Sequence, residues 1–443
     1  MKRNRINTNY FFPKPVCVFP MIPIIIQLDA PIYLAAICWL FIYAIRYYIF
    51  TPVALSIPKG DVKGETDLDP NIDPFVSIIL PLFNEENVVD RLLAACTSLG
   101  YPDYEVIVVD DSTDKTTQKL EKWKSHPHVK VIHREKCEGW KGGALNVGIK
   151  NTDPRSTHVL VFDADFLPRP GLVERFLLHF ENPSVQVVQG YQKHDLNADE
   201  NWITKAIRIL HSTTYKIELE ARSKLGMFIP VMGSVFMART EILRRIPFDS
   251  NISEDYSLTL RLYLKGYKVI YDSGLSASGE CPSTIRRVVK QIGRWAEGTT
   301  RNTKQYFWKI VRSKHLSMKQ KFDFILTGFS YFNGLLVLIT TVIGIVNLFL
   351  LNYDFHYFPL LLAADLTTIA IPSAVVVQVA ALYRDGASKK LKTLPYSMLM
   401  TYVLLPVTSY YSLKGIFRDQ KWFHRTFKTG RIVESFSDME RAI

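Results

Sequence analysis

The chain has 443 residues, too many for one compact core, so two or more regions are expected. Hydrophobic residues make up 48% of the sequence and gather toward both ends, which favours a domain held between membrane segments. The five scattered cysteines form no CxxC or Cys/His spacing, so they support neither a disulfide framework nor a zinc site and fit a reduced, cytosolic domain. The net charge of +12 comes largely from basic residues beside the apolar segments, which fits positive-inside flanking, anionic lipid headgroups or a nucleotide diphosphate better than nucleic acid, for which no motif is present.

The first 57 residues are expected to anchor the chain in a membrane. Residues 31–50 carry Arg46 as their only charge and are long enough to cross about 30 Å of hydrocarbon. Because the amino terminus lacks a small-residue cleavage site, we expect an anchor and not a removed signal peptide. Residues 58–73 are rich in Pro, Gly and Asp and are interpreted as a linker.

Residues 74–303 alternate between expected strands and helices. Short β-branched runs separated by helical patterns predict an α/β domain with a mostly parallel sheet covered on both faces. Ligands of such sheets bind at the carboxyl ends of the strands. The expected strands are 76–80, 105–109, 129–133, 159–162, 185–189 and an interrupted run at 228–237; the expected helices are 85–99, 116–124, 141–150, 200–225 and 253–265.

The carboxyl-terminal part is expected to meet the membrane again. Residues 304–332 have basic and aromatic side chains at helical spacing, which predicts amphipathic helices in the interface. Apolar stretches at 333–351, 357–381 and 393–415 predict a transmembrane region over 333–415, followed by a basic cytosolic tail over 416–443. A cytosolic tail requires an even number of crossings; because Pro395 and Pro406 interrupt the last stretch, an interfacial or re-entrant path is its alternative.

Two carboxylates follow the expected strand 159–162. Asp163 and Asp165 lie two residues apart, so both can address one hard cation such as Mg²⁺ or Mn²⁺, which would neutralise a diphosphate. The alternative is a solvated acidic turn. Two further carboxylates, Asp110 and Asp111, follow strand 105–109; either could accept a base N–H, or cap the next helix in an Asx-turn.

A QxxRW pattern lies between residues 291 and 295. On a helix, Gln291, Arg294 and Trp295 share one face, so that an amide, a permanent cation and a large aromatic ring point the same way. The guanidinium fork suits a diphosphate and the indole suits a sugar ring.

Taken in order, these motifs resemble those of the membrane family-2 glycosyltransferases, which include the cellulose, hyaluronan, chitin and mannan synthases. The resemblance covers about residues 74–306. It implies a GT-A fold flanked by transmembrane helices, a nucleotide-sugar donor with UDP favoured, a divalent metal, and transfer with inversion at the anomeric carbon. Asp163 and Asp165 would hold the metal, and Asp255 in the Ser-Glu-Asp element would be the catalytic base.

The resemblance assigns the other site residues too, each with a plainer alternative. Lys141, before Gly142-Gly143, would supply a charge to the nucleotide, or be a solvated lysine at a helix start. Gly233-Ser234 resembles an acceptor-site element, although close packing explains a glycine equally well. The nucleotide-binding set is then Asn84, Glu85, Asp110, Asp111, Lys141 and Asp163, and the acceptor and diphosphate platform is Gly233, Ser234, Glu254, Gln291, Arg294 and Trp295.

Residues 423–428 resemble the gating loop of cellulose synthases, with Arg425 in place of valine. If this loop closes over the nucleotide, Thr426 and Lys428 would contact the diphosphate. The competing interpretation is a basic anchor beside the membrane.

The function expected from the sequence is glycosyl transfer to a growing β-linked polysaccharide at the cell membrane, by a multi-pass protein with a cytosolic catalytic domain. Single transfer to a lipid acceptor is the first alternative, and an inactive membrane scaffold is the second. The expected partners are a nucleotide-sugar donor, a glycan or lipid acceptor and membrane lipids. Nucleic acid is not among them, and the oligomeric state is left open.

Overall fold

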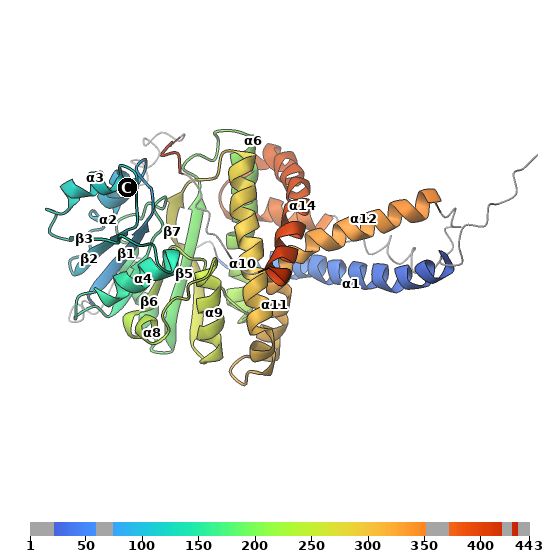
Figure 1. Cartoon of the computed structure of the whole chain (residues 1–443), viewed down its shortest axis with the longest axis horizontal. Coiled ribbons are helices and arrows are strands. Elements are labelled where there is room, and N and C mark those ends of the chain that lie inside the picture. The colour runs from blue at the N-terminus through green and yellow to red at the C-terminus, as the bar shows by residue number, and fades with distance from the viewer. Residues whose placement is uncertain (1–21, 59–73, 351–371, 419–427, 433–443) are drawn as a thin grey trace, which may run out of the picture.

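The computed structural model describes residues 22–58, 74–350, 372–418 and 428–432. Strands and their covering helices gather at one end of the molecule (Figure 1), and helices α1 (Ile22–Leu55) and α12 (Asn333–Leu350) project from the other. Long helices lie between these two parts, among them α10 (Ile285–Arg312) and α14 (Leu394–Phe417). The strands lie between residues 76 and 279, and α10 follows them directly.

One seven-stranded sheet runs through this domain in the order β3-β2-β1-β4-β6-β5-β7. The pairs β1/β2, β2/β3, β1/β4 and β5/β7 are parallel, and only β6 runs antiparallel to both of its neighbours. The mostly parallel sheet expected from the sequence is confirmed. The strands are β1 (Val76–Leu82), β2 (Tyr104–Asp110), β3 (Val129–His133), β4 (His158–Val161), β5 (Val185–His194), β6 (Phe236–Arg239) and β7 (Lys268–Gly279).

Alternate side chains of the central strands pack into hydrophobic clusters on opposite faces of the sheet. Ile78 and Leu80 of β1 join one cluster, and Ile79 between them joins another. Burial on both faces explains why β1 is apolar apart from Ser77. The helices of the domain are α2 (Val89–Cys96), α3 (Thr116–Leu120), α4 (Trp140–Lys150), α5 (Leu172–Leu177), α6 (Trp202–Thr213), α7 (Glu220–Leu225), α8 (Thr240–Arg245) and α9 (Glu254–Leu264).

The structure corrects several expected elements. The helix expected over 85–99 is only α2, and the helix expected over 116–124 ends as a 3-10 turn, Glu121–Trp123. The strand expected over 228–237 is reduced to β6, because Gly233 and Val235 have φ values of 79° and 53°, which a strand does not accommodate. The expected helix over 200–225 forms, but its middle, Thr214–Leu219, is π-helical. Strand β7 was not expected at all.

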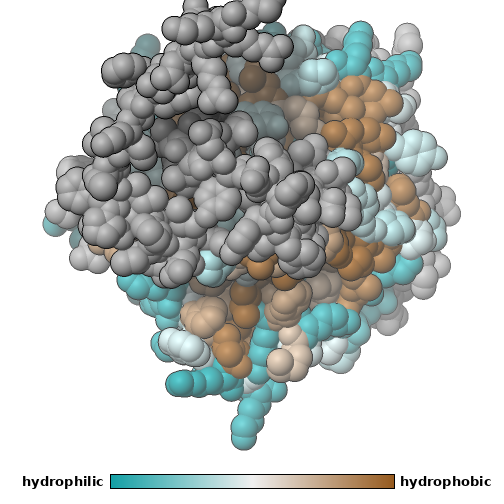
Figure 2. Space-filling view, turned by 90° about the vertical axis from the view of Figure 1, so that its right-hand side faces the viewer, coloured by the Kyte–Doolittle hydropathy of each residue, from teal (hydrophilic) through white to brown (hydrophobic). Residues whose placement is uncertain are grey.

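The part of the chain that was expected to meet a membrane differs from expectation as well. Among the described residues, only Pro31–Leu55 is long and apolar enough to span a membrane, and α11 (Met318–Gly328) with residues 330–343 forms a second candidate if its 42° bend belongs to one span. Helix α14 does not meet that criterion and instead packs along α10, α6 and α12. Of the stretch expected at 357–381, residues 357–371 lie outside the described residues, and 372–384 are helical. Figure 2 views the molecule from the end at which α1 and α12 project, and hydrophobic side chains are visible on that face.

The single charge in the apolar part of α1 is paired with the sheet domain. Arg46 is 4% exposed, and its guanidinium lies 3.3 Å from a carboxylate oxygen of Glu218 in the π-helical segment. The hydroxyl of Tyr47 donates to the other oxygen of Glu218 at 3.2 Å. Because a buried cation is costly unless paired, these contacts fix α1 against the domain.

Candidate functional site

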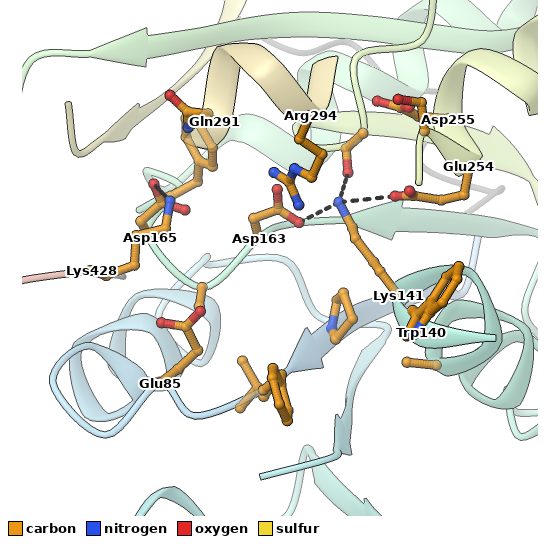
Figure 3. Close-up of a pocket in the computed structure, with 18 of the residues that line it drawn as sticks. Glu85, Trp140, Lys141, Asp163, Asp165, Glu254, Asp255, Gln291, Arg294 and Lys428 are labelled. Atoms are coloured by element: carbon orange, nitrogen blue, oxygen red, sulfur yellow. Dashed lines mark hydrogen bonds and ion pairs between the residues drawn. The ribbon is translucent and has the colours of Figure 1, made fainter. Parts of the chain in front are cut away.

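A cavity of about 470 Å³ lies at the carboxyl ends of β1, β2 and β4, between the sheet and α10. Figure 3 shows side chains from the sheet edge, α4, α9 and α10 that converge on it. Most of the expected site residues line this cavity. They are Glu85, Asp111, Lys141, Asp163, Asp165, Gly233, Glu254, Asp255, Gln291, Arg294, Trp295 and Lys428.

Lys141 contacts residues from three different walls of the cavity (Figure 3). Its Nζ lies 2.6 Å from Asp163 Oδ1 and 3.5 Å from Glu254 Oε1, and it donates to the carbonyl of Gly233 at 2.8 Å. Burial alone would lower the pKa of Lys141, but the charges of Asp163 and Glu254 outweigh it and raise that pKa, so the ammonium stays charged. The backbone N–H of Asp163 donates to Ser234 Oγ at 2.8 Å, which fixes the carboxylate at the strand end.

Asp165 forms an ion pair with a second lysine, Lys428. Its side chain is 1% exposed and pairs with Lys428 Nζ, while its Oδ1 is buried and has no hydrogen-bond partner. The segment 428–432 is held at the cavity because Glu280 accepts hydrogen bonds from the N–H groups of Thr429 and Gly430, both at 3.0 Å. Lys428 therefore lines the cavity beside Asp165, and Thr426, the other residue expected in the gating loop, lies outside the described residues.

The two aspartates suit a hard divalent cation that is shared with a substrate. Both offer carboxylate oxygens, and the unpartnered oxygen of Asp165 is a donor atom left for such an ion. No group of three or more His, Cys, Asp or Glu side chains that could hold a metal occurs in the described parts of the chain. Mg²⁺ commonly binds through one or two carboxylates together with substrate phosphates, so this pair fits a cation completed by a diphosphate.

Asp255 lies in the first turn of α9, where Gly233 approaches it closely. Gly233 has a left-handed backbone, and a Cβ there would lie 2.7 Å from Asp255 Oδ2, so only glycine fits. Burial and the neighbouring charge of Glu254 raise the pKa of Asp255 to about 7, against an opposing effect of Lys141. A carboxyl group with that pKa is suited to general-base chemistry near neutral pH. Ser253 is the N-cap residue of α9, but its side chain makes no capping hydrogen bond.

Gln291, Arg294 and Trp295 lie together on the cavity wall, as their helical spacing predicts. Helix α14 supports them from behind. The ring of Tyr411 packs against Gly293, where a Cβ would lie 2.6 Å from the ring. The platform is therefore held by a helix about 120 residues further along the chain, which the sequence pattern did not indicate.

Asn84, Asp110 and Ser234 do not line the cavity. Asp110 is fully buried and accepts hydrogen bonds from Ser112 N at 3.0 Å and Thr117 Oγ1 at 2.6 Å, so it shapes the turn after β2. Asn84 Oδ1 accepts from the N–H of Thr113 at 2.7 Å and holds the same turn. Between the two carboxylates that the sequence left open, Asp111 is the one at the cavity.

Several lining residues were missed. Trp140 directly precedes Lys141, and its left-handed backbone (φ 49°) gave no sequence signal. Gln192 and His194 lie at the end of β5, beyond residue 189, where the expected strand stopped. Recognising a strand of ten residues would have placed both at the ligand-binding edge.

Comparisons with known proteins agree with this arrangement. Residues 77–246 match the model of glycosyl transferase family 2. The chain is 29% identical over 321 residues to probable glucomannan 4-beta-mannosyltransferase 14 of Arabidopsis thaliana (69% of this chain, 59% of the relative), and 30% identical over 282 residues to glucomannan 4-beta-mannosyltransferase 9 of the same plant (60% and 52%). The chain thus spans between half and three fifths of these curated relatives.

Among solved structures, the mannosyltransferase of Pyrobaculum calidifontis in complex with GDP-Man and Mn²⁺ superposes with a TM-score of 0.57 at 20% identity, covering 88% of this chain and 99% of that one. At this identity the likeness shows the fold alone. The expected GT-A fold and the expected resemblance to family 2 are both confirmed: residues 77–246 match the glycosyl transferase family 2 model.

Proposed function

We propose that this chain is an inverting glycosyltransferase that moves mannose from a nucleotide sugar to a β-linked polysaccharide at a membrane. One observation carries the proposal: a single cavity brings together the aspartate pair, a carboxyl group with its pKa near neutrality, and the QxxRW platform. The names of the relatives support mannose as the sugar. UDP is the carrier that the motifs favour, and the GDP-Man complex of the structural neighbour makes GDP its competitor.

In the proposed reaction Asp255 takes the proton of an acceptor hydroxyl. The hydroxyl oxygen attacks the anomeric carbon from the face opposite the diphosphate, and the bond from that carbon to the diphosphate oxygen breaks, so the configuration inverts. Lys141 and Arg294 supply positive charge where the leaving diphosphate becomes more negative. A divalent metal held by Asp163 and Asp165 would add Lewis-acid neutralisation of the same group.

The other residues of the cavity orient the two substrates. Asp111 lines the side near α4, Glu85 lines the side near Lys428, and both would contact the nucleotide. Trp295 would offer its ring face to the acceptor sugar. Membrane attachment through α1 would keep the catalytic domain on the cytosolic side, where nucleotide sugars are available. Its supports are the apolar span Pro31–Leu55 and the pairing of Arg46 with the domain.

The test is a donor panel with the full-length protein in detergent or lipid. UDP- and GDP-linked glucose and mannose are supplied with Mn²⁺ and a manno-oligosaccharide, and release of nucleoside diphosphate is measured. We expect turnover with a mannosyl donor and a product that β-mannanase degrades. Product in the lipid extract would favour the single-transfer alternative, and no release from any donor would favour the inactive scaffold.

A further inference from the structure

A row of four aromatic rings leads from the aspartate pair to the QxxRW platform, and three of them, Phe166, His194 and Trp295, line the cavity. Phe166, next to Asp165, meets His194 edge-on with ring centroids 5.4 Å apart. His194 stacks on His211 of α6 at 3.8 Å, and His211 meets Trp295 edge-on at 5.8 Å. Three separate elements, β5, α6 and α10, thus place His194 one ring away from the tryptophan.

The imidazole of His194 is fixed in one tautomer. Its Nδ1 lies 2.9 Å from the carbonyl oxygen of Gln192, which can only accept, so Nδ1 carries the hydrogen and Nε2 presents a lone pair. The side chain is 4% exposed and lines the cavity. No described residue donates to Nε2. Burial and the charge of Lys428 lower the pKa of His194 to about 3, so the ring stays neutral at any working pH.

A second acceptor without a hydrogen-bond partner belongs to Gln291, which also lines the cavity. Gln291 is 6% exposed, and its Oε1 is buried without a hydrogen-bond partner. Buried acceptors without donors destabilise a protein unless a ligand supplies the missing hydrogens. A sugar suits this site because its ring offers an apolar face for Trp295 and hydroxyl donors around its edge.

We propose that His194 Nε2 and Gln291 Oε1 form a hydroxyl-binding subsite, in which each accepts a hydrogen bond from one acceptor sugar whose ring lies against Trp295. The subsite deepens the proposed function and rests on it. It belongs to the acceptor and not to the donor, because the ring row joins His194 to Trp295, whereas Asp111 and Lys141 occupy the part of the cavity near α4. His194 would thereby help to select the acceptor sugar by the arrangement of its hydroxyl groups.

The test combines a ring replacement with deoxygenated acceptors. His194→Phe keeps an aromatic ring on His211 but removes the Nε2 lone pair, together with the Nδ1–H that bonds to the Gln192 carbonyl. In this variant we expect the KM for the manno-oligosaccharide to rise by about fivefold to tenfold, the loss expected for one hydrogen bond, while the KM for the donor and slow donor hydrolysis change little. Monodeoxy acceptors are then compared on both proteins. For the analogue that lacks the bonded hydroxyl, the affinity for the wild type should be about as low as the affinity of the full acceptor for His194→Phe. Replacing the wild type with His194→Phe should not lower the affinity for this analogue any further.

Two further variants separate recognition from packing. His194→Gln carries an amide oxygen and should recover part of the acceptor affinity if the lone pair matters. His211 contacts His194 and Trp295 but does not itself line the cavity, and His211→Phe keeps a ring in the row. A KM increase equal to that of His194→Phe would therefore show that only packing is involved.

Each remaining outcome is decisive. The subsite is refuted if no monodeoxy acceptor distinguishes the wild type from His194→Phe, if the donor KM rises instead, or if Mn²⁺ affinity measured by calorimetry falls, which would make His194 a metal ligand. A wild-type protein that releases nucleoside diphosphate from no donor overturns the proposed function itself. That result precedes and is distinct from any comparison of variants.

Discussion

The pH dependence of turnover offers the sharpest test of the role proposed for Asp255. Only the carboxylate form can accept a proton, and burial together with the charge of Glu254 raises the pKa of Asp255 from an ordinary 3.8 to about 7. The rate should therefore rise with pH through neutrality and fall about tenfold for each pH unit on the acid side. Glu254→Gln keeps the size of the side chain but removes one of the two main causes of the raised pKa.

In Glu254→Gln we expect the midpoint of the acid limb to move down by about one pH unit, because burial of Asp255, the larger cause, remains. Lys141 keeps its closer partner Asp163 at 2.6 Å, so the wall of the cavity should hold its geometry. Turnover of the wild type and of Glu254→Gln is measured with saturating donor across the pH range at one fixed Mn²⁺ concentration. The test is the difference between the midpoints of the two pH profiles. Glu241→Gln on α8, whose side chain is 61% exposed, is the matched control and should leave the midpoint in place.

Two results would contradict this reasoning. Identical midpoints in the wild type and Glu254→Gln would show that Asp255 is not the group that limits the acid side. A turnover number that survives Asp255→Asn would exclude it as the base, since loss of a general base costs about 100-fold or more.

Three further predictions concern the other walls of the cavity. Replacing Asp163 or Asp165 with Asn should lower Mn²⁺ affinity by about tenfold or more in calorimetry with a nucleoside diphosphate present, and unchanged affinity would move the metal elsewhere. Lys428→Met should raise Mn²⁺ affinity in the same assay, because a tethered cation no longer competes for the buried carboxylate; lower affinity would mean that the lysine supports the site. Trp295→Ala should impair acceptor-dependent transfer while slow donor hydrolysis persists, whereas Arg294→Lys should slow both reactions, because the bidentate fork on the diphosphate is lost. Equal loss of both reactions in purified, monodisperse Trp295→Ala would make the indole a packing residue.

The local pattern of the sequence determined most of the sheet domain. Runs such as 76–80 and 159–162 identify buried strands because a strand covered on both faces consists mostly of apolar side chains, and Ser77 is the one polar residue in these two runs. The carboxylates that follow these runs must lie at one edge when the strands are parallel, so the position of Asp163 and Asp165 followed from chain order alone. The helical spacing of Gln291, Arg294 and Trp295 likewise placed them on one face.

Tertiary structure decided the elements whose stability comes from distant partners. Strand β7 ends in Ser-Gly-rich sequence with little strand propensity, yet it forms because it pairs with β5 over most of its length. The same pairing extends β5 past residue 189 and brings Gln192 and His194 to the cavity.

The contact between Lys428 and Asp165 joins positions 263 residues apart, and the pairing of Arg46 with Glu218 joins positions 172 apart. Neither pairing is visible in the composition of its own segment. Side-chain periodicity reports which face of an element is buried, but it carries no information about which other surface covers that face. The choice of partner depends on how the whole chain packs, and this is why the expected motifs were found in the sequence while the shape of the cavity that joins them was not.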